Sequence, residues 1–77
     1  MPTVLRVGPY RFSFFSNERN EPPHVHVIRG DNEAKLWLTP INLADNHGYN
    51  ERELRKVTLL VEENRARLLE MWYEHFR

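Results

Sequence analysis

The sequence predicts an α+β fold, in which a four-stranded antiparallel sheet of two hairpins packs on a long C-terminal helix, with a short helix between them. Two hairpin patterns fill the first half of the 77-residue chain, and an uninterrupted helical pattern fills its last third. This length predicts a single domain over residues 1–77. Because the chain has no cysteine, its stability has to come from core packing, completed where necessary by a partner.

The first hairpin is predicted from two strand-like segments, residues 3–7 and 10–16, which are separated only by Gly8-Pro9. Both segments are rich in β-branched and aromatic residues, which favour strands. The register that aligns one apolar face pairs Val7 with Tyr10, Leu5 with Phe12, and Thr3 with Phe14.

The second hairpin is predicted around a two-residue turn at Gly30-Asp31. A loop of this length brings small and branched apolar side chains opposite each other on one face, whereas a three-residue loop breaks that match. The apolar face then pairs Arg29 with Asn32, Val27 with Ala34, and Val25 with Leu36. The opposite face pairs Ile28 with Glu33, His26 with Lys35, and His24 with Trp37.

Between the hairpins, residues 17–23 form a polar loop that contains Glu18 and Glu21 and ends in Pro22-Pro23. The two prolines favour extended backbone and so fix how the next strand begins. After the fourth strand, Thr39 is a candidate cap and Pro40 a candidate first residue of a short helix, with Gly48 past its end. We expect one or two helical turns there.

The C-terminal helix is predicted to begin at Asn50, which forms a capping-box pattern with Glu53. A stripe of positions spaced three and four apart follows, widened by Leu60 and Trp72. Its members are Leu54, Val57, Val61, Asn64, Leu68, Met71 and His75. A straight helix of this length would reach roughly 40 Å, so its far end has to bend, protrude or find a partner. Asn64 either forms a hydrogen bond that sets the packing or lies at the solvated edge of the stripe.

The candidate site is the sheet face that carries the two histidines, because side chains alternate between faces along a strand. We expect this face to be exposed and to be basic and aromatic, although the eleven basic and eleven acidic side chains of the chain cancel. It comprises Arg6, Arg11, Ser13, His24, His26, Lys35 and Trp37, with Glu33 at its rim.

This combination suggests metal-independent cleavage of RNA, in which histidines transfer protons and cations hold phosphate. His26 is the preferred acid or base, His24 the second proton carrier, and Lys35 the group that stabilises phosphate charge. Arg6 and Arg11 would bind phosphates and Trp37 would stack on a base. Arg29 points to the other face and would reach the site only from the strand end.

Two alternatives to a catalytic face stay open. The first is an ordinary solvated sheet face, whose charges prevent aggregation. The second is a metal site, which would need further ligands to converge on the two histidines from Glu18, Glu21, Glu33, His47 or His75. Because no spacing in the sequence brings these residues together, we expect no metal ion and no other cofactor.

Several segments of the chain resemble a bacterial family catalogued as domain of unknown function 4160. They are residues 1–4, 8–12, 16–18, 21–27, 33–35, 37–38 and 63–65. The resemblance implies the toxin component of a two-gene toxin-antitoxin module, neutralised by a small antitoxin of the family catalogued as domain of unknown function 2442. It implies no settled catalytic mechanism. The competing function is a non-catalytic module that binds protein or nucleic acid.

The amino-acid composition predicts where in the cell the protein is found. The chain has no charged-then-apolar leader and no apolar run of the length of a membrane span, so we expect a cytoplasmic protein without membrane contact. The apolar stripe that outruns the sheet is expected to be covered by the antitoxin or by a second copy of the chain.

Overall fold

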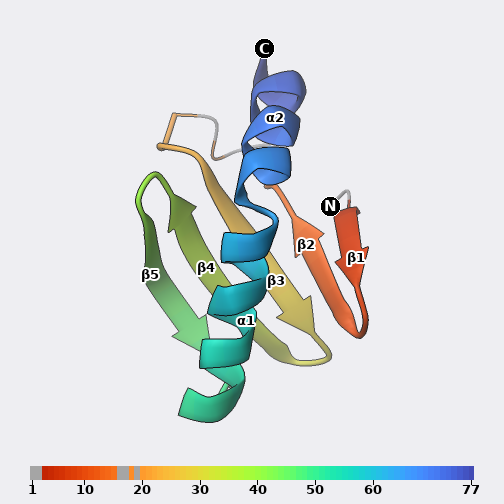
Figure 1. Ribbon diagram of the computed structural model, residues 1–77, viewed down its shortest axis with the longest axis vertical. Helices are drawn as coiled ribbons and strands as arrows, with labels where there is room; N and C mark the ends of the chain where they lie inside the picture. Colours follow the sequence, from red (N-terminus) through yellow and green to blue (C-terminus); the bar gives the residue numbers. More distant parts are fainter. Residues whose placement is uncertain (1–2, 16–17, 19) are drawn as a thin grey trace.

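The computed structural model describes residues 3–15, 18 and 20–77, and it has an antiparallel sheet of five strands in the order β1-β2-β3-β4-β5, followed by two helices (Figure 1). The α+β class is therefore confirmed, whereas the predicted number of strands is wrong. The elements are β1 (Thr3–Val7), β2 (Tyr10–Ser13), β3 (His24–Arg29), β4 (Asn32–Leu38), β5 (Ile41–His47), α1 (Glu51–Glu63) and α2 (Arg65–Phe76).

The first hairpin forms with its turn at Gly8-Pro9, and its register is confirmed near the turn, where Val7 pairs with Tyr10 and Leu5 with Phe12. The predicted pairing of Thr3 with Phe14 is wrong, because an irregularity between Thr3 and Leu5 shifts the register and places Thr3 opposite Ser13. Strand β2 ends at Ser13, and the predicted end of this strand at residue 16 lies outside the described residues.

Every predicted pair of the second hairpin is present between β3 and β4. The turn residue Gly30 has a φ of 59°, a conformation that glycine adopts at little cost. The alternation of side chains then places the valines of β3 on one face and its histidines on the other. The facial assignment on which the candidate site depends is thus confirmed.

The predicted short helix after β4 is wrong, because residues 41–47 form a fifth strand, β5. Thr39 and Pro40 make the turn into this strand instead of starting a helix. Strand β5 pairs with β4 from Glu33 to Leu38 and so satisfies backbone groups that β4 would otherwise present as an open edge. Pairing with the preceding strand therefore outweighs the helix-like pattern of Pro40 and Gly48.

The predicted C-terminal helix is divided at Asn64 into α1 and α2. Its start is confirmed, since the side chain of Asn50 accepts a hydrogen bond from the backbone N–H of Glu53 at 2.8 Å. At the break, Asn64 Nδ2 donates to the carbonyl oxygen of Leu60 at 2.8 Å, a local bond that competes with regular helix. Arg65 then donates from Nε to the carbonyl oxygen of Leu38 at 2.7 Å and ties α2 to the end of β4.

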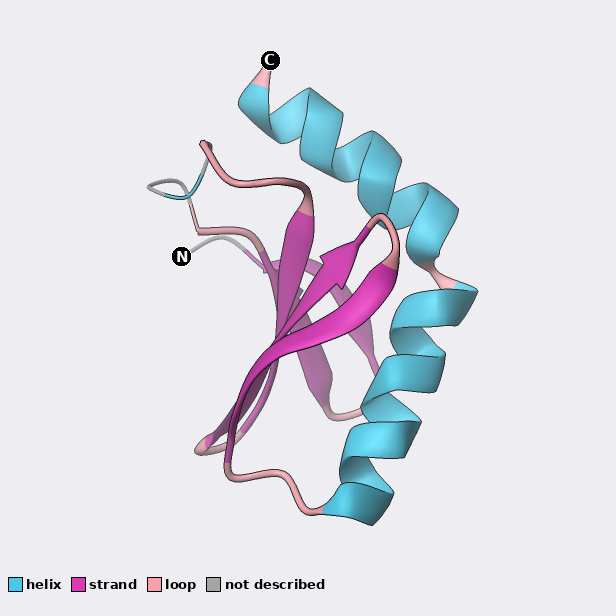
Figure 2. Ribbon diagram, turned by 90° about the vertical axis from the view of Figure 1, so that its left-hand side faces the viewer, coloured by secondary structure: helices cyan, strands magenta, loops and turns pink. Residues whose placement is uncertain are grey.

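Both helices lie on one side of the sheet (Figure 2), and they share one apolar core with it. Helix α1 contributes Val57 and Val61, and α2 contributes Leu68 and Trp72. Figure 1 shows α2 continuing past the strand ends. The bend at Asn64 allows both helices to fit in a fold whose longest extent is 34 Å. The sheet side of the core is formed by Tyr10, Phe12, Phe14, Val25, Val27, Ala34, Leu36 and Leu38.

In the part of the chain that the structure describes, neither helix has the length and apolar character needed to cross a membrane.

Candidate functional site

The two histidines of β3 lie on the same sheet face, with His24 opposite Trp37 and His26 opposite Lys35. Their ring centroids are 5.4 Å apart and the rings are nearly perpendicular, at 78°. The diproline before β3 places His24 at the first position of the strand. The predicted clustering of the two imidazoles is therefore present.

The expectation that the histidine face is solvent-exposed is wrong for both rings, because His24 is 0% exposed and His26 is 4% exposed. Phe15 stacks on His26 with a centroid distance of 3.6 Å and an interplanar angle of 2°. The ring of His24 packs against Trp37 and against Trp72 of α2, with distances between ring centroids of 5.4 Å and 4.9 Å, respectively. Phe15, which precedes β3, and Trp72 of α2 thus cover the two rings. The alternation of side chains along the strand, taken alone, would predict that the rings are exposed to water.

The carboxylate of Glu18 joins the two histidines, since Glu18 Oε1 lies 2.7 Å from Nε2 of His24 and 2.7 Å from Nε2 of His26. The other nitrogen of each ring also has a partner. Nδ1 of His24 is 2.9 Å from the carbonyl oxygen of Pro22, and Nδ1 of His26 is 3.0 Å from Oε2 of Glu33. We call Glu18, His24 and His26 the histidine cluster.

Each ring nitrogen of the histidine cluster therefore lies within hydrogen-bond distance of an oxygen atom. The two Nε2 atoms share Oε1 of Glu18, and Glu33 is a second acidic partner of His26.

The charge on Glu18 is stabilised by its partners. Burial alone would raise the pKa of this carboxyl group, but the hydrogen bonds from His24 and His26 outweigh burial and lower the pKa to about 2. Glu18 is therefore ionised at neutral pH. Its side chain is 18% exposed, so the carboxylate lies where solvent meets the buried rings.

Lys35 lies beside the histidine cluster, but carboxylates hold its ammonium group. Nζ of Lys35 is 2.6 Å from Oε1 of Glu21 and 3.6 Å from Oε2 of Glu18, and it lies 4.8 Å from the ring centre of Trp37. Burial opposes the charged form, yet the contacts with Glu21 and Glu18 raise the pKa of Lys35 overall. The lysine thus neutralises these acidic groups in the structure.

The predicted substrate-binding residues are dispersed. Arg29 lies on the helix-covered side, where it forms an ion pair with Glu53 and lies over the ring of Tyr10. Arg6 and Arg11 pair with each other across the first hairpin, and Arg11 is opposite Ile28, two positions along β3 from His26. Among the predicted substrate-binding residues, only Trp37 contacts a ring of the histidine cluster, through His24.

Ser13 has an unusual environment on the histidine face. It lies opposite His26 in the register of β2 and β3 and is 1% exposed. Within the described residues, its Oγ is the buried side-chain polar atom that has no hydrogen-bond partner. A buried hydroxyl without a partner carries a free-energy cost, so it indicates a position where a polar ligand or water would be accommodated.

The other two histidines do not join the histidine cluster. His47 is exposed in β5, and its Nε2 lies 2.9 Å from Oδ2 of Asp45. His75 packs beside Phe14 and Phe76 at the outer end of α2. Neither residue therefore supplies a further ligand to the histidine cluster.

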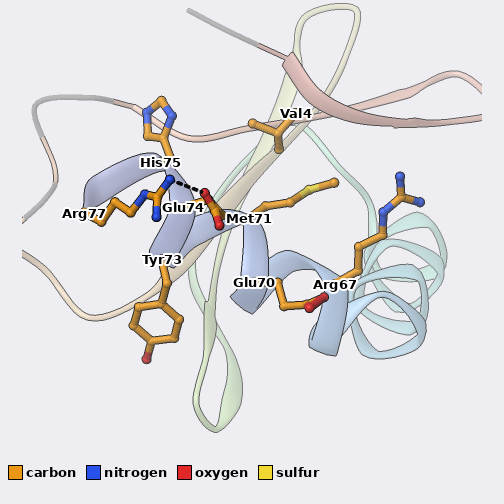
Figure 3. Close-up of a pocket in the computed structure, with 8 residues that line it drawn as sticks. All are labelled: Val4, Arg67, Glu70, Met71, Tyr73, Glu74, His75 and Arg77. Carbon is orange, nitrogen blue, oxygen red and sulfur yellow. Dashed lines mark ion pairs between the residues drawn. The ribbon is translucent and has the colours of Figure 1, made fainter.

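A separate surface hollow lies between β1 and α2 (Figure 3). Figure 3 shows the side chain of Met71 extending from α2 toward Val4 of β1. Charged residues flank these apolar groups, and Glu74 forms an ion pair with Arg77 at 3.2 Å. The hollow is lined by Val4, Arg67, Glu70, Met71, Tyr73, Glu74, His75 and Arg77.

The family model described as domain of unknown function (DUF4160) matches residues 10–73. The chain belongs to the DUF4160 family. The match begins at β2 and ends within α2, so it includes all three residues of the histidine cluster. Neither a curated protein nor a solved structure matches this DUF4160 chain.

Sequence reasoning did not predict the central position of Glu18 in this DUF4160 chain. The alternation of side chains along a strand located the histidines, but Glu18 lies outside the strands and helices, where no such periodicity applies. The sequence does carry one signal for Glu18, which is its small separation along the chain from Pro22-Pro23, the diproline that fixes the start of β3.

Proposed function

We propose that this DUF4160 protein is the toxin component of a two-gene module, neutralised by a small antitoxin that binds the hollow between β1 and α2. Membership of the family supports the proposal through the resemblance described above. The observation that carries the proposed binding surface is the position of α2, which continues beyond the strand ends (Figure 1). A helix in this position presents side chains that its own sheet does not cover.

The chemistry of the hollow fits a protein partner. Tyr73 is 62% exposed, and Val4 and Met71 are only partly buried. Protein interfaces commonly combine an aromatic and methionine-rich centre with a polar rim. The rim here carries both signs of charge, since Arg67 and Arg77 lie beside Glu70 and Glu74. A small antitoxin with an apolar segment and charges of both signs would match this surface.

Replacing Tyr73 by aspartate is expected to weaken antitoxin binding about tenfold or more, because it places a charge among the apolar contacts. The matched control is Leu59→Asp, since Leu59 is also an exposed apolar helix residue, at 53%, but lies on α1 outside the hollow. Isothermal titration of the full chain with the protein encoded by the adjacent gene measures both affinities. Equal loss in the two variants, or no complex with the unsubstituted chain, would contradict the proposal.

The second candidate is action on RNA through the histidine cluster. It is supported by two proton-carrying rings that share one carboxylate, with Lys35 at 3.6 Å from the same carboxylate. Imidazoles and a cation in this arrangement suit proton transfer at a phosphodiester. Because both rings are buried, Glu18 would have to withdraw before a phosphate could contact either Nε2.

Growth arrest on expression of the chain separates the two candidates. If the histidine cluster acts on RNA, His26→Gln should abolish growth arrest while antitoxin binding is retained, and His47→Gln should leave both unchanged. Circular dichroism verifies that the variants are folded. Growth arrest that persists in folded His26→Gln would remove the RNA-cleavage candidate and support a toxin that acts through binding alone.

A further inference from the structure

We infer that the histidine cluster binds one divalent first-row transition-metal ion, such as Zn²⁺ or Fe²⁺, through Oε1 of Glu18 and Nε2 of His24 and His26. This inference does not rest on the proposed function. It concerns the ligand chemistry of three side chains, and it stands or falls independently of antitoxin binding and of any action on RNA.

The three donor atoms already converge. One ligand atom from each residue lies within 4.8 Å of the other two, and Glu18 Oε1 is 2.7 Å from both ring nitrogens. Ligands bound at about 2.0–2.1 Å in a tetrahedral site lie about 3.4 Å apart. A withdrawal of the carboxylate by less than about 1 Å would therefore open the space for an ion.

The remaining nitrogen of each ring is held as it is in known metal sites. Metal-binding histidines commonly donate their second N–H to a backbone carbonyl or a carboxylate, which fixes the ring and directs the other nitrogen at the metal. His24 has the carbonyl of Pro22 at 2.9 Å, and His26 has the carboxylate of Glu33 at 3.0 Å. Both Nε2 atoms are thereby directed to the same point at Glu18.

The environment of Glu18 favours binding through one oxygen. Its Oε2 lies 3.6 Å from the ammonium of Lys35, whereas its Oε1 faces the two rings. Lys35 is itself held by Glu21, which keeps the ammonium group on the Oε2 side. The arrangement leaves Oε1 as the single carboxylate ligand.

The donor set selects the class of ion. Two imidazoles and one carboxylate suit Zn²⁺ or Fe²⁺, whereas Mg²⁺ and Ca²⁺ prefer oxygen ligands. Three protein ligands leave at least one coordination position for water. The buried Oγ of Ser13, opposite His26 and without a hydrogen-bond partner, is a candidate partner for such a water molecule.

The test is isothermal titration of the full chain with Zn²⁺, after a chelator has removed any bound metal. One equivalent is expected to bind to the unsubstituted chain. Glu18→Gln should weaken binding about a hundredfold or more, and Glu33→Gln, which removes only the charge of a supporting contact, about tenfold to a hundredfold. His47→Gln is the matched control, because His47 also pairs with a carboxylate but is 71% exposed, and it should bind as the unsubstituted chain does.

A second measurement needs no substitution and covers the case in which Glu18→Gln does not fold. Paramagnetic Co²⁺ added to the unsubstituted chain should shift the NMR signals of the His24 and His26 rings at one equivalent, before those of His47 and His75. The inference is overturned if no equivalent binds, if His47→Gln removes binding, or if Co²⁺ first shifts the signals of His47 or His75.

Discussion

Trp72→Ala is expected to lower the free energy of unfolding by about 3–5 kcal/mol, the largest effect of any single substitution considered for this protein. Trp72 is 4% exposed and contacts Phe14 at 5.3 Å, Phe76 at 4.2 Å and His24 at 4.9 Å between ring centroids. Its removal leaves a cavity where α2 meets the end of the sheet. A domain of this kind has a total stability of about 5–15 kcal/mol, so a large part of it would be lost.

Urea denaturation followed by circular dichroism measures this change. Tyr73→Ala is the matched control, because Tyr73 is an aromatic residue in the next position of α2 but is 62% exposed. Its effect is expected to stay within about 0.5 kcal/mol. Similar losses in the two variants would mean that α2 does not pack on the sheet as described.

Stability is expected to depend on pH through Glu18. The pKa of this carboxyl group is about 2 in the folded protein, below an ordinary value of 4.5, because the hydrogen bonds from His24 and His26 outweigh burial. The stabilisation is therefore complete above pH 4.5 and is lost as the pH falls toward 2. The shift corresponds to about 3 kcal/mol at neutral pH.

The difference in stability between the unsubstituted chain and Glu18→Gln isolates this contribution. It should be about 3 kcal/mol at pH 7 and should shrink steadily as the pH falls below 4.5. Asp45→Asn is the control, since Asp45 also pairs with a histidine but is 60% exposed. A difference for Glu18→Gln that is small at pH 7, or that stays constant down to pH 2, would contradict the histidine cluster as described.

The second hairpin was predictable from the sequence because two local constraints agree. The length of the turn at Gly30-Asp31 fixes the register, and the apolar residues of both strands fix the face. All six predicted pairs are present, including His26 with Lys35. The start of α1 was predictable for the same kind of reason, since the hydrogen bond between Asn50 and Glu53 is local in sequence.

Strand β5 was not predictable from local signals. Pro40 and Gly48 have the spacing that brackets a short helix, and the segment between them carries no clear alternation. What decides its structure is the open edge of β4, which offers backbone groups from Glu33 to Leu38. Because this edge belongs to the preceding strand, a window of the sequence that covers only residues 41–47 does not reveal it.

The burial of the histidines was missed for a related reason. Strand parity assigns a side chain to a face but says nothing about what covers that face. Here Phe15 covers His26, and Trp72, distant in sequence, covers His24. Glu18 completes the histidine cluster from outside the strands and helices, so no sequence repeat predicts its position.

The most direct test of the account is whether one carboxylate, that of Glu18, bonds both buried imidazoles. Long-range ¹H–¹⁵N NMR spectra of the histidine side chains, recorded at neutral pH without added metal, report on each ring nitrogen separately. The account predicts that Glu18→Gln shifts the Nε2 signals of both His24 and His26 and leaves that of His47 unchanged. Unchanged Nε2 signals for His24 and His26 in a folded Glu18→Gln variant would contradict it.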